Sequence, residues 1–273
     1  MFCVEVMTLE RRSTLPKSES QTRVQSVERV FRLLEKLVMH TEMSLGQLAE
    51  EVGMHKSTAY RLLQTLIQLG YVEQNETQGS YRIGLRMIEM GGMAIRSWPL
   101  HRAAEPIMDH LASELGEAVN LAIEDGLEMV YVVTVDAYQP LRMQLNVGRR
   151  APIHCTAVGK AALAHNPDLM RRLRDQKPVL QRFTDHTITN WDRLQVELDL
   201  IRARGYAIDD EEQAEGARCV ASPIVNHRNH VTAVLGISAP SAHLSRERAD
   251  EVGPRIVDAA RQISERLGYL GKA

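Results

Sequence analysis

The chain has 273 residues, of which 44% are hydrophobic and 25% are charged, and its net charge is −2. This length predicts about two domains, and the balance of apolar and charged residues excludes a disordered or strongly basic protein. Because no apolar run approaches the roughly 20 residues that cross a bilayer, we expect no membrane segment.

Residues 1–23 are expected to form a flexible N-terminal arm. They contain arginine, lysine and serine residues but no central apolar block of the kind that marks a secretory signal. The three cysteines of the chain, Cys3, Cys155 and Cys219, lack the paired spacing of a zinc site and suggest no disulfide framework. We therefore expect a cytoplasmic protein without a metal or a cofactor.

Three helices are predicted after the arm. The first spans Val24 to His40, where apolar residues recur at steps of three and four and predict one buried face. These apolar residues are Val27, Val30, Phe31, Leu34, Leu37 and Val38. A short second helix begins after Ser44, which forms a capping pattern with Gln47, and Gly53 is suited to end it. The third helix is predicted from Lys56 to Leu69.

The third helix carries a polar face near its N-terminus that is typical of a recognition helix in a DNA major groove. The polar residues are His55, Lys56, Ser57, Thr58, Tyr60, Arg61 and Gln64. Arginine and lysine side chains donate to guanine, glutamine pairs with adenine, and hydroxyl groups anchor phosphates. Residues 71–74 and 80–83 are predicted to pair as a hairpin, which would form a wing.

The alternative for this segment is an ordinary small helical bundle with a solvated polar face. Residues 24–84 hold six basic and seven acidic residues, so they have no basic excess. An attraction to DNA phosphates must therefore come from local placement of the basic side chains and from the N-terminal arm.

The order of residues in this segment carries a family resemblance. Residues 54–66 read Met-His-Lys-Ser-Thr-Ala-Tyr-Arg-Leu-Leu-Gln-Thr-Leu, and Leu69-Gly70-Tyr71-Val72 and Tyr81-Arg82-Ile83-Gly84 follow. This run resembles the DNA-binding domain of the IclR family of bacterial regulators. The resemblance implies a winged helix-turn-helix over residues 24–84 that binds double-stranded operator DNA.

Residues 85–99 are predicted to form a linker helix. Leu85, Ile88, Met93 and Ile95 give it an apolar surface, and an exposed helix of this kind usually finds a partner. The resemblance implies that this helix joins subunits into a homodimer or a dimer of dimers. The alternative is an ordinary connector between the two domains.

Residues 100–270 are predicted to form an α+β domain with a mixed sheet. Strands are expected at residues 119–123, 129–135 and 141–146, and a hairpin is expected from residues 219–225 and 231–238. Helices are expected at residues 100–115, 156–165, 168–175, 191–204 and 245–267.

Three stretches of this second domain, residues 148–161, 205–212 and 216–221, resemble the effector domain of the same family. The resemblance implies a GAF-like mixed α/β fold that binds a small organic acid, such as a sugar acid or a keto acid. Residues 211–216 and the pair Arg149-Arg150 are similar to the family's repressors of ketodeoxygluconate and pectin-sugar catabolism. The implied function is repression of a catabolic operon.

The predicted effector site begins at Thr156, whose hydroxyl can cap a helix. A helix N-terminus presents unpaired N–H groups and partial positive charge, which suit a carboxylate. The resemblance implies that six residues bind the effector: Met143, Ala157, Val158, Asp209, Cys219 and Ser238. In this set Met143 forms an apolar wall and the last three residues contact polar atoms of the ligand. Gly236 stands where many relatives have a second serine.

Two other functions are alternatives to that of a regulator. In the first, the chain is an enzyme that converts a small acid, with Cys219 as nucleophile and a histidine such as His154 as base. Since no triad spacing, phosphate loop or metal cluster accompanies these residues, we predict that the chain is not an enzyme. In the second, the C-terminal domain serves only assembly.

Ordinary structural roles are also open for some of these residues. Cys219 and Met143 are core residues by default. The acidic run 209–212 would ordinarily be a solvated loop, with Arg218 paired to it.

Overall fold

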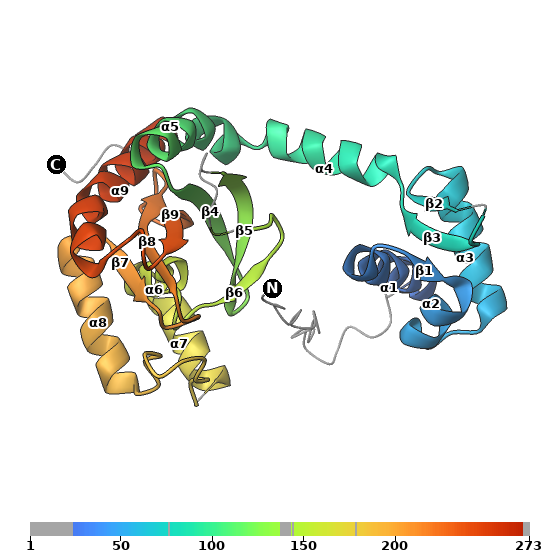
Figure 1. Ribbon diagram of the computed structural model, residues 1–273, viewed down its shortest axis with the longest axis horizontal. Helices are drawn as coiled ribbons and strands as arrows, with labels where there is room; N and C mark the ends of the chain where they lie inside the picture. The colour runs from blue at the N-terminus through green and yellow to red at the C-terminus, as the bar shows by residue number, and fades with distance from the viewer. Residues whose placement is uncertain (1–23, 76, 137–142, 144, 178, 270–273) are drawn as a thin grey trace. The chain divides into compact units, whose positions relative to one another are not determined.

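The computed structural model describes residues 24–75, 77–136, 143, 145–177 and 179–269. The predicted N-terminal arm therefore lies outside the described residues. The chain divides into two compact units that meet between Ala94 and Ile95. Figure 1 shows both units, and each is described by itself.

The first unit has the helices and strands of a winged helix-turn-helix, as predicted. Its helices are α1 (Gln25–His40), α2 (Leu45–Val52) and α3 (Lys56–Gln68). Its strands are β1 (Met43–Ser44), β2 (Val72–Gln74) and β3 (Ser80–Ile83), in the antiparallel order β1-β3-β2. The two-residue strand β1 was not predicted.

The local signals around α2 act as the sequence indicates. The backbone N–H of Ser44 donates to Gln47 Oε1 over 2.9 Å, and the Gln47 N–H donates back to Ser44 Oγ over 3.3 Å. Gly53 ends the helix with a φ of 71°, a left-handed conformation that favours glycine. These caps set the tight turn that places α3 relative to α2.

The predicted buried face of α1 is wrong for half of its residues. Leu34 and Leu37 are buried, but Val27, Phe31 and Val38 are 50%, 57% and 65% exposed. Leu33, which the prediction left out, is fully buried. The apolar stripe of α1 is wider than the surface that α2 and the small sheet can cover, so part of it remains open to solvent.

The second unit is built on a six-stranded sheet in the order β6-β5-β4-β9-β8-β7. The strands are β4 (Ala118–Asp125), β5 (Glu128–Val135), β6 (Arg150–Pro152), β7 (Ala207–Asp210), β8 (Ala217–Val225) and β9 (Val231–Pro240). Every pair of neighbouring strands that the structure describes is antiparallel, which corrects the predicted mixed sheet. Short connections such as β4–β5 and β8–β9 form hairpins, and a hairpin forces antiparallel pairing.

Helices cover both faces of this sheet, which confirms the α+β class (Figure 1). One core joins the sheet to α5 (Pro99–Leu115) and α9 (Arg246–Arg266). The other core joins the opposite face to α6 (Ala157–His165), α7 (Pro167–Gln176) and α8 (Trp191–Arg204). The helix α4 (Leu85–Ser97) contains the boundary between the two units.

Strand β7 was not predicted at all, nor was β6. Of the strand expected at residues 141–146, residues 141, 142 and 144 lie outside the described residues, and Met143, Leu145 and Asn146 belong to no strand.

Candidate functional site

The first candidate site is the polar face of α3. Ala59, Leu63 and Leu66 are buried against the small core, so the opposite side of the helix faces outward. The predicted DNA-contacting residues follow this division. His55, Lys56, Ser57, Tyr60 and Arg61 are exposed, and Thr58 and Gln64 are half-buried. The structure thus leaves the seven side chains on and around one accessible helix end.

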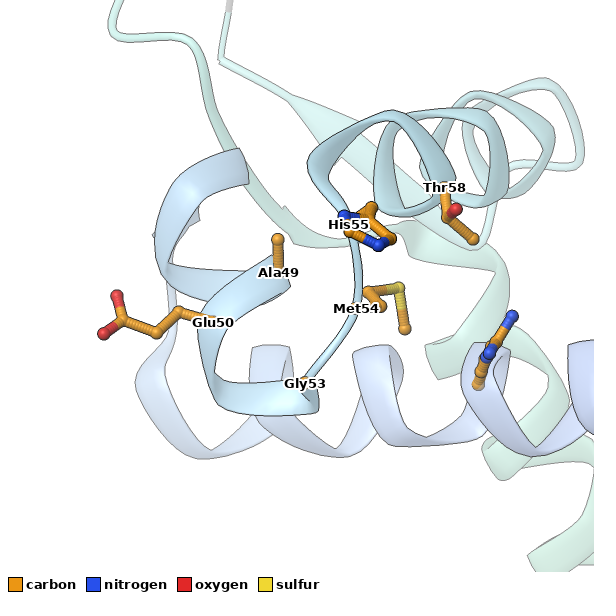
Figure 2. A pocket seen from close by; sticks show the side chains of 7 residues that line it. Ala49, Glu50, Gly53, Met54, His55 and Thr58 are labelled. Atoms are coloured by element: carbon orange, nitrogen blue, oxygen red, sulfur yellow. The ribbon is translucent and has the colours of Figure 1, made fainter.

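A hollow lies beside the N-terminus of α3, where the turn from α2 passes over α1 (Figure 2). Its lining includes Arg29, Glu50, His55 and Thr58. His55 is the N-cap residue of α3, but its side chain makes no capping hydrogen bond. The Thr58 N–H donates to the His55 carbonyl over 2.9 Å, and the N–H groups that precede it at the start of the helix suit an anionic partner such as a phosphate.

Ion pairs divide the basic residues of this unit into two groups. Lys36 pairs with Glu51 at 3.0 Å, and Arg82 pairs with Glu73 at 2.9 Å. For Lys56 and Arg61 no ion pair is found among the described residues. Although this unit has no basic excess, the positive charges of Lys56 and Arg61 are therefore not neutralised by those carboxylates.

The second candidate site is on the sheet face that α6 covers. Asp209, Cys219 and Ser238 lie in direct register on β7, β8 and β9. Side chains that oppose each other in neighbouring strands point to the same face. The structure therefore brings together three of the predicted effector residues, which are far apart in the sequence.

The N-terminus of α6 is held firmly against the same face. The Thr156 hydroxyl accepts from the Gly159 N–H over 3.1 Å and donates to the Pro152 carbonyl over 2.6 Å. A Cβ on Gly159 would lie 2.2 Å from the Ile153 carbonyl oxygen, so only glycine permits this approach. Ala157 and Val158 are buried in the first turn, whose N–H groups have no acceptor within the helix. These donors suit a carboxylate.

Asp209 is buried in β7 and not in a solvated loop. Its side chain is 2% exposed, and Oδ1 accepts from the backbone N–H groups of Glu212 over 2.8 Å and Gln213 over 3.4 Å. Burial, together with the neighbouring Glu212 carboxylate, raises the pKa of Asp209 to about 7. The carboxyl can thus be either a hydrogen-bond acceptor or a donor near neutral pH.

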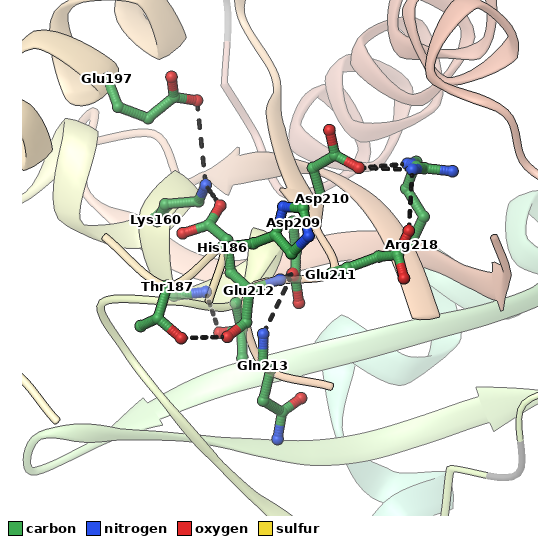
Figure 3. A network of polar contacts seen from close by, with 12 residues as sticks. Lys160, His186, Thr187, Glu197, Asp209, Asp210, Glu211, Glu212, Gln213 and Arg218 are labelled. Carbon is green, nitrogen blue, oxygen red and sulfur yellow. Dashed lines mark hydrogen bonds and ion pairs between the residues drawn. The ribbon is translucent and has the colours of Figure 1, made fainter. Parts of the chain in front are cut away.

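A network of charged residues lies around Asp209 (Figure 3). Lys160, only 1% exposed, pairs with Glu212 and lies 3.9 Å from Glu197. Arg218 donates to Asp210 Oδ1 over 2.7 Å, which confirms the predicted pairing of Arg218 with the acidic run. Lys160 and Glu212 were not predicted as part of a site, although they lie in two of the stretches that carry the family resemblance, residues 148–161 and 205–212.

Cys219 and His154 have separate surroundings. Burial, with the nearby Asp209 carboxylate, raises the pKa of the Cys219 thiol to about 12, so the thiolate nucleophile is not populated at neutral pH. His154 lies 2.9 Å from the Gln181 carbonyl oxygen, and burial lowers its pKa. Met143 is half-buried and lies in no helix or strand.

Both units match known families of domains. The model of the IclR helix-turn-helix domain matches residues 26–76, and the model of the bacterial transcriptional regulator IclR C-terminal domain matches residues 92–265. The chain is 38% identical to the HTH-type transcriptional regulator KdgR of Escherichia coli over 252 residues, which cover 90% of this chain and 94% of the relative.

Two further comparisons extend over nearly the whole chain. The transcriptional repressor IclR of Escherichia coli is 31% identical over 265 residues, which cover 96% of each chain. The crystal structure of the Thermotoga maritima IclR matches with a TM-score of 0.76 and 31% identity, and the match covers 89% of this chain and 99% of that one. None of the helices in the described part of the chain has the length and apolar character needed to span a membrane.

Proposed function

The chain belongs to the IclR family of bacterial transcriptional regulators and is a DNA-binding regulator, not an enzyme; from this premise we propose that it represses a catabolic operon under the control of a small organic acid. The observation that carries the proposal is the accessible polar face of α3 in a helix-turn-helix. The resemblance to a relative named as a repressor supports repression. Because such a regulator acts on the chromosome, we place it in the cytoplasm.

We infer that α3 enters a major groove with seven contacting residues. These are His55, Lys56, Ser57, Thr58, Tyr60, Arg61 and Gln64. Arginine and lysine are suited to guanine or phosphate, and the uncapped N-terminus of α3 is suited to a phosphate.

The test is operator affinity in variants of these cations. We expect Lys56→Ala and Arg61→Ala each to lose about 1–3 kcal/mol of operator-binding free energy if the side chain contacts a base. If it contacts a phosphate instead, the slope of the logarithm of the binding constant against the logarithm of the salt concentration should become shallower by about 1. Arg228→Ala, an exposed cation in the hairpin turn of the second unit, is the matched control. Unchanged operator affinity in both α3 variants at two salt concentrations contradicts the proposal.

The sensing half of the proposal places an acid on the face of the sheet that α6 covers. The N–H groups of Ala157 and Val158 receive the carboxylate, Asp209, Cys219 and Ser238 contact other polar atoms, and Met143 forms an apolar wall. The register of β7, β8 and β9 and the capped start of α6 support this arrangement. An acid that binds only one of two conformations shifts their equilibrium and so changes operator affinity.

The oligomer is also part of the proposal. Operator half-sites mirror the two-fold symmetry of a protein dimer. The exposed apolar residues of α1 and α4 support a homodimer, because large apolar surfaces of this kind are rarely left in water. A dimer of dimers would pair further surfaces.

A further inference from the structure

The proposed effector site extends into a longer row of polar side chains that crosses five neighbouring strands. We call this the polar row: Thr134, Asn120, Ser238, Cys219 and Asp209. Thr134 opposes Asn120 on β5 and β4. The Asn120 amide donates from Nδ2 to Ser238 Oγ over 3.1 Å and joins this pair to the three residues on β9, β8 and β7. The inference below rests on the proposed sensing function.

Two atoms at one end of the polar row are buried and have no hydrogen-bond partner among the described residues. They are Asn120 Oδ1 and Thr134 Oγ1, and Asn120 is only 1% exposed. Leaving a buried polar atom unpaired destabilises a fold, and native proteins contain few such atoms. Two of them in one cross-strand pair, beside three residues of the candidate site, point to a polar group that binds there.

Gly236 keeps the side-chain amide oxygen of Asn120, Oδ1, accessible to such a group. It lies directly opposite Asn120 on β9. A Cβ on Gly236 would lie 3.1 Å from Asn120 Oδ1 and 3.3 Å from Ala221 Cβ, which is tighter than ordinary contact. A side chain at this position would therefore press on the unpaired oxygen, whereas glycine leaves it free.

The chemistry of the two atoms decides what they bind. An amide oxygen only accepts hydrogen bonds, and a threonine hydroxyl accepts or donates. A carboxylate or a keto oxygen has no proton to give to Asn120, whereas a hydroxyl group has. We propose that Asn120 and Thr134 form a hydroxyl-binding subsite, which makes the protein select hydroxylated short-chain acids over acids of the same length without the hydroxyl groups.

The experiment compares matched pairs of acids by calorimetry on the full chain: glycerate with propionate, threonate with butyrate, and gluconate with hexanoate. A site built to bind a hydroxyl rejects the analogue that lacks it, because its own polar atoms are then left unpaired. We expect the hydroxylated member of at least one pair to bind about tenfold more tightly or better. We expect Thr134→Val and Asn120→Leu each to remove most of that preference.

Two controls separate this role from a structural one. Ser222→Ala changes a buried hydroxyl of β8 that donates to the Gly205 carbonyl, on the face toward α5 and α9, and should leave the preference unchanged. Thr134→Val should leave the melting temperature without ligand unchanged or raise it, because it removes an unpaired buried hydroxyl. A purely structural threonine would lower the melting temperature and leave the preference intact.

Three outcomes overturn the inference. In the first, the two members of every pair bind equally. In the second, both variants keep the full preference, as expected if an ordered water satisfies the two atoms. In the third, no acid of either kind binds. If the acids bind without any preference, the failure is confined to the hydroxyl subsite. If no acid binds but operator binding is retained, the sensing half of the proposed function fails as well, and if operator binding is also lost, the whole proposed function fails.

Discussion

Asp209 links the candidate effector site to pH through a single side chain. In the unfolded chain its carboxyl titrates at the ordinary value of 3.8, and in the folded protein its pKa is about 7. Between these two values the folded protein binds the extra proton. The free energy of unfolding therefore falls as the pH rises from about 4 to about 7, because the folded protein binds a proton that the unfolded chain has already lost. Above this range the buried carboxyl is charged, and burial disfavours the charged form.

Replacement of Asp209 by asparagine should remove this pH dependence. The amide oxygen of Asp209→Asn can still accept from the Glu212 N–H, but it carries no charge at any pH. We expect the variant to gain melting temperature relative to the unsubstituted protein at pH 8 and to gain less at pH 5. Thermal unfolding at both pH values measures the difference. An equal difference at both would show that Asp209 does not hold the raised pKa.

The same residues show what a sequence can predict at this scale. Asp209, Cys219 and Ser238 were identified through a family resemblance, and the structure confirms only that they lie together. Asn120 and Thr134 were missed because each sits within an apolar strand pattern, and a pattern does not tell which residue of another strand opposes it. Their importance depends on register and on an unpaired atom, and both are properties of the folded sheet.

The start of α3 has no side-chain cap, and we propose that its backbone donors are used for contact with DNA. Asparagine, aspartate, serine and threonine stabilise a helix from the N-cap position, and histidine does not. The side chain of His55 makes no capping bond, whereas Ser44 caps the neighbouring helix α2. A free N-terminus costs stability but leaves donors for a DNA phosphate.

Two substitutions at His55 test whether a cap on α3 raises stability and lowers operator affinity. His55→Ser and His55→Asp should each raise the free energy of unfolding by about 0.5–2 kcal/mol by capping α3, as measured by denaturant titration. His55→Asp should also weaken operator binding strongly, because it sets a negative charge against the phosphates, and the uncharged His55→Ser should weaken it less. Equal operator affinity of the histidine and aspartate forms would argue that this helix end stays away from DNA.

Elements with strong local signals were predicted to within one or two residues. Helix α2 begins after Ser44, α8 ends before Gly205, and α9 begins after Ser245. Serine is favoured at the start of a helix and glycine directly after its end. The short strands β1, β6 and β7 were missed because they exist only through pairing with β3, β5 and β8. Two to four residues cannot show an alternating pattern, and their partners lie elsewhere along the chain.

For the whole molecule, the apolar stripe of α1 has the spacing of a helix that pairs with another helix. Val24, Val27, Phe31 and Val38 are all at least half exposed. With the buried Leu34 they occupy alternate steps of three and four, the seam of a coiled coil. The sequence pattern predicted that this whole face is buried, but it cannot tell whether the cover comes from the same chain or from a second copy.

The double variant Val27→Glu/Phe31→Glu should therefore separate the subunits without unfolding them. Both side chains are exposed in the single chain, so charged groups there cost little in the monomer, whereas two copies facing each other would bury four like charges. We expect light scattering to show a smaller particle with an unchanged circular dichroism spectrum. Val179→Glu, at an exposed valine of the second unit, should keep the original size.

Because one recognition helix contacts only one half-site, the dissociated variant should also lose operator affinity. An undiminished particle size would instead assign the subunit contact to another surface, of which the exposed Leu85 and Ile88 of α4 are the next to test.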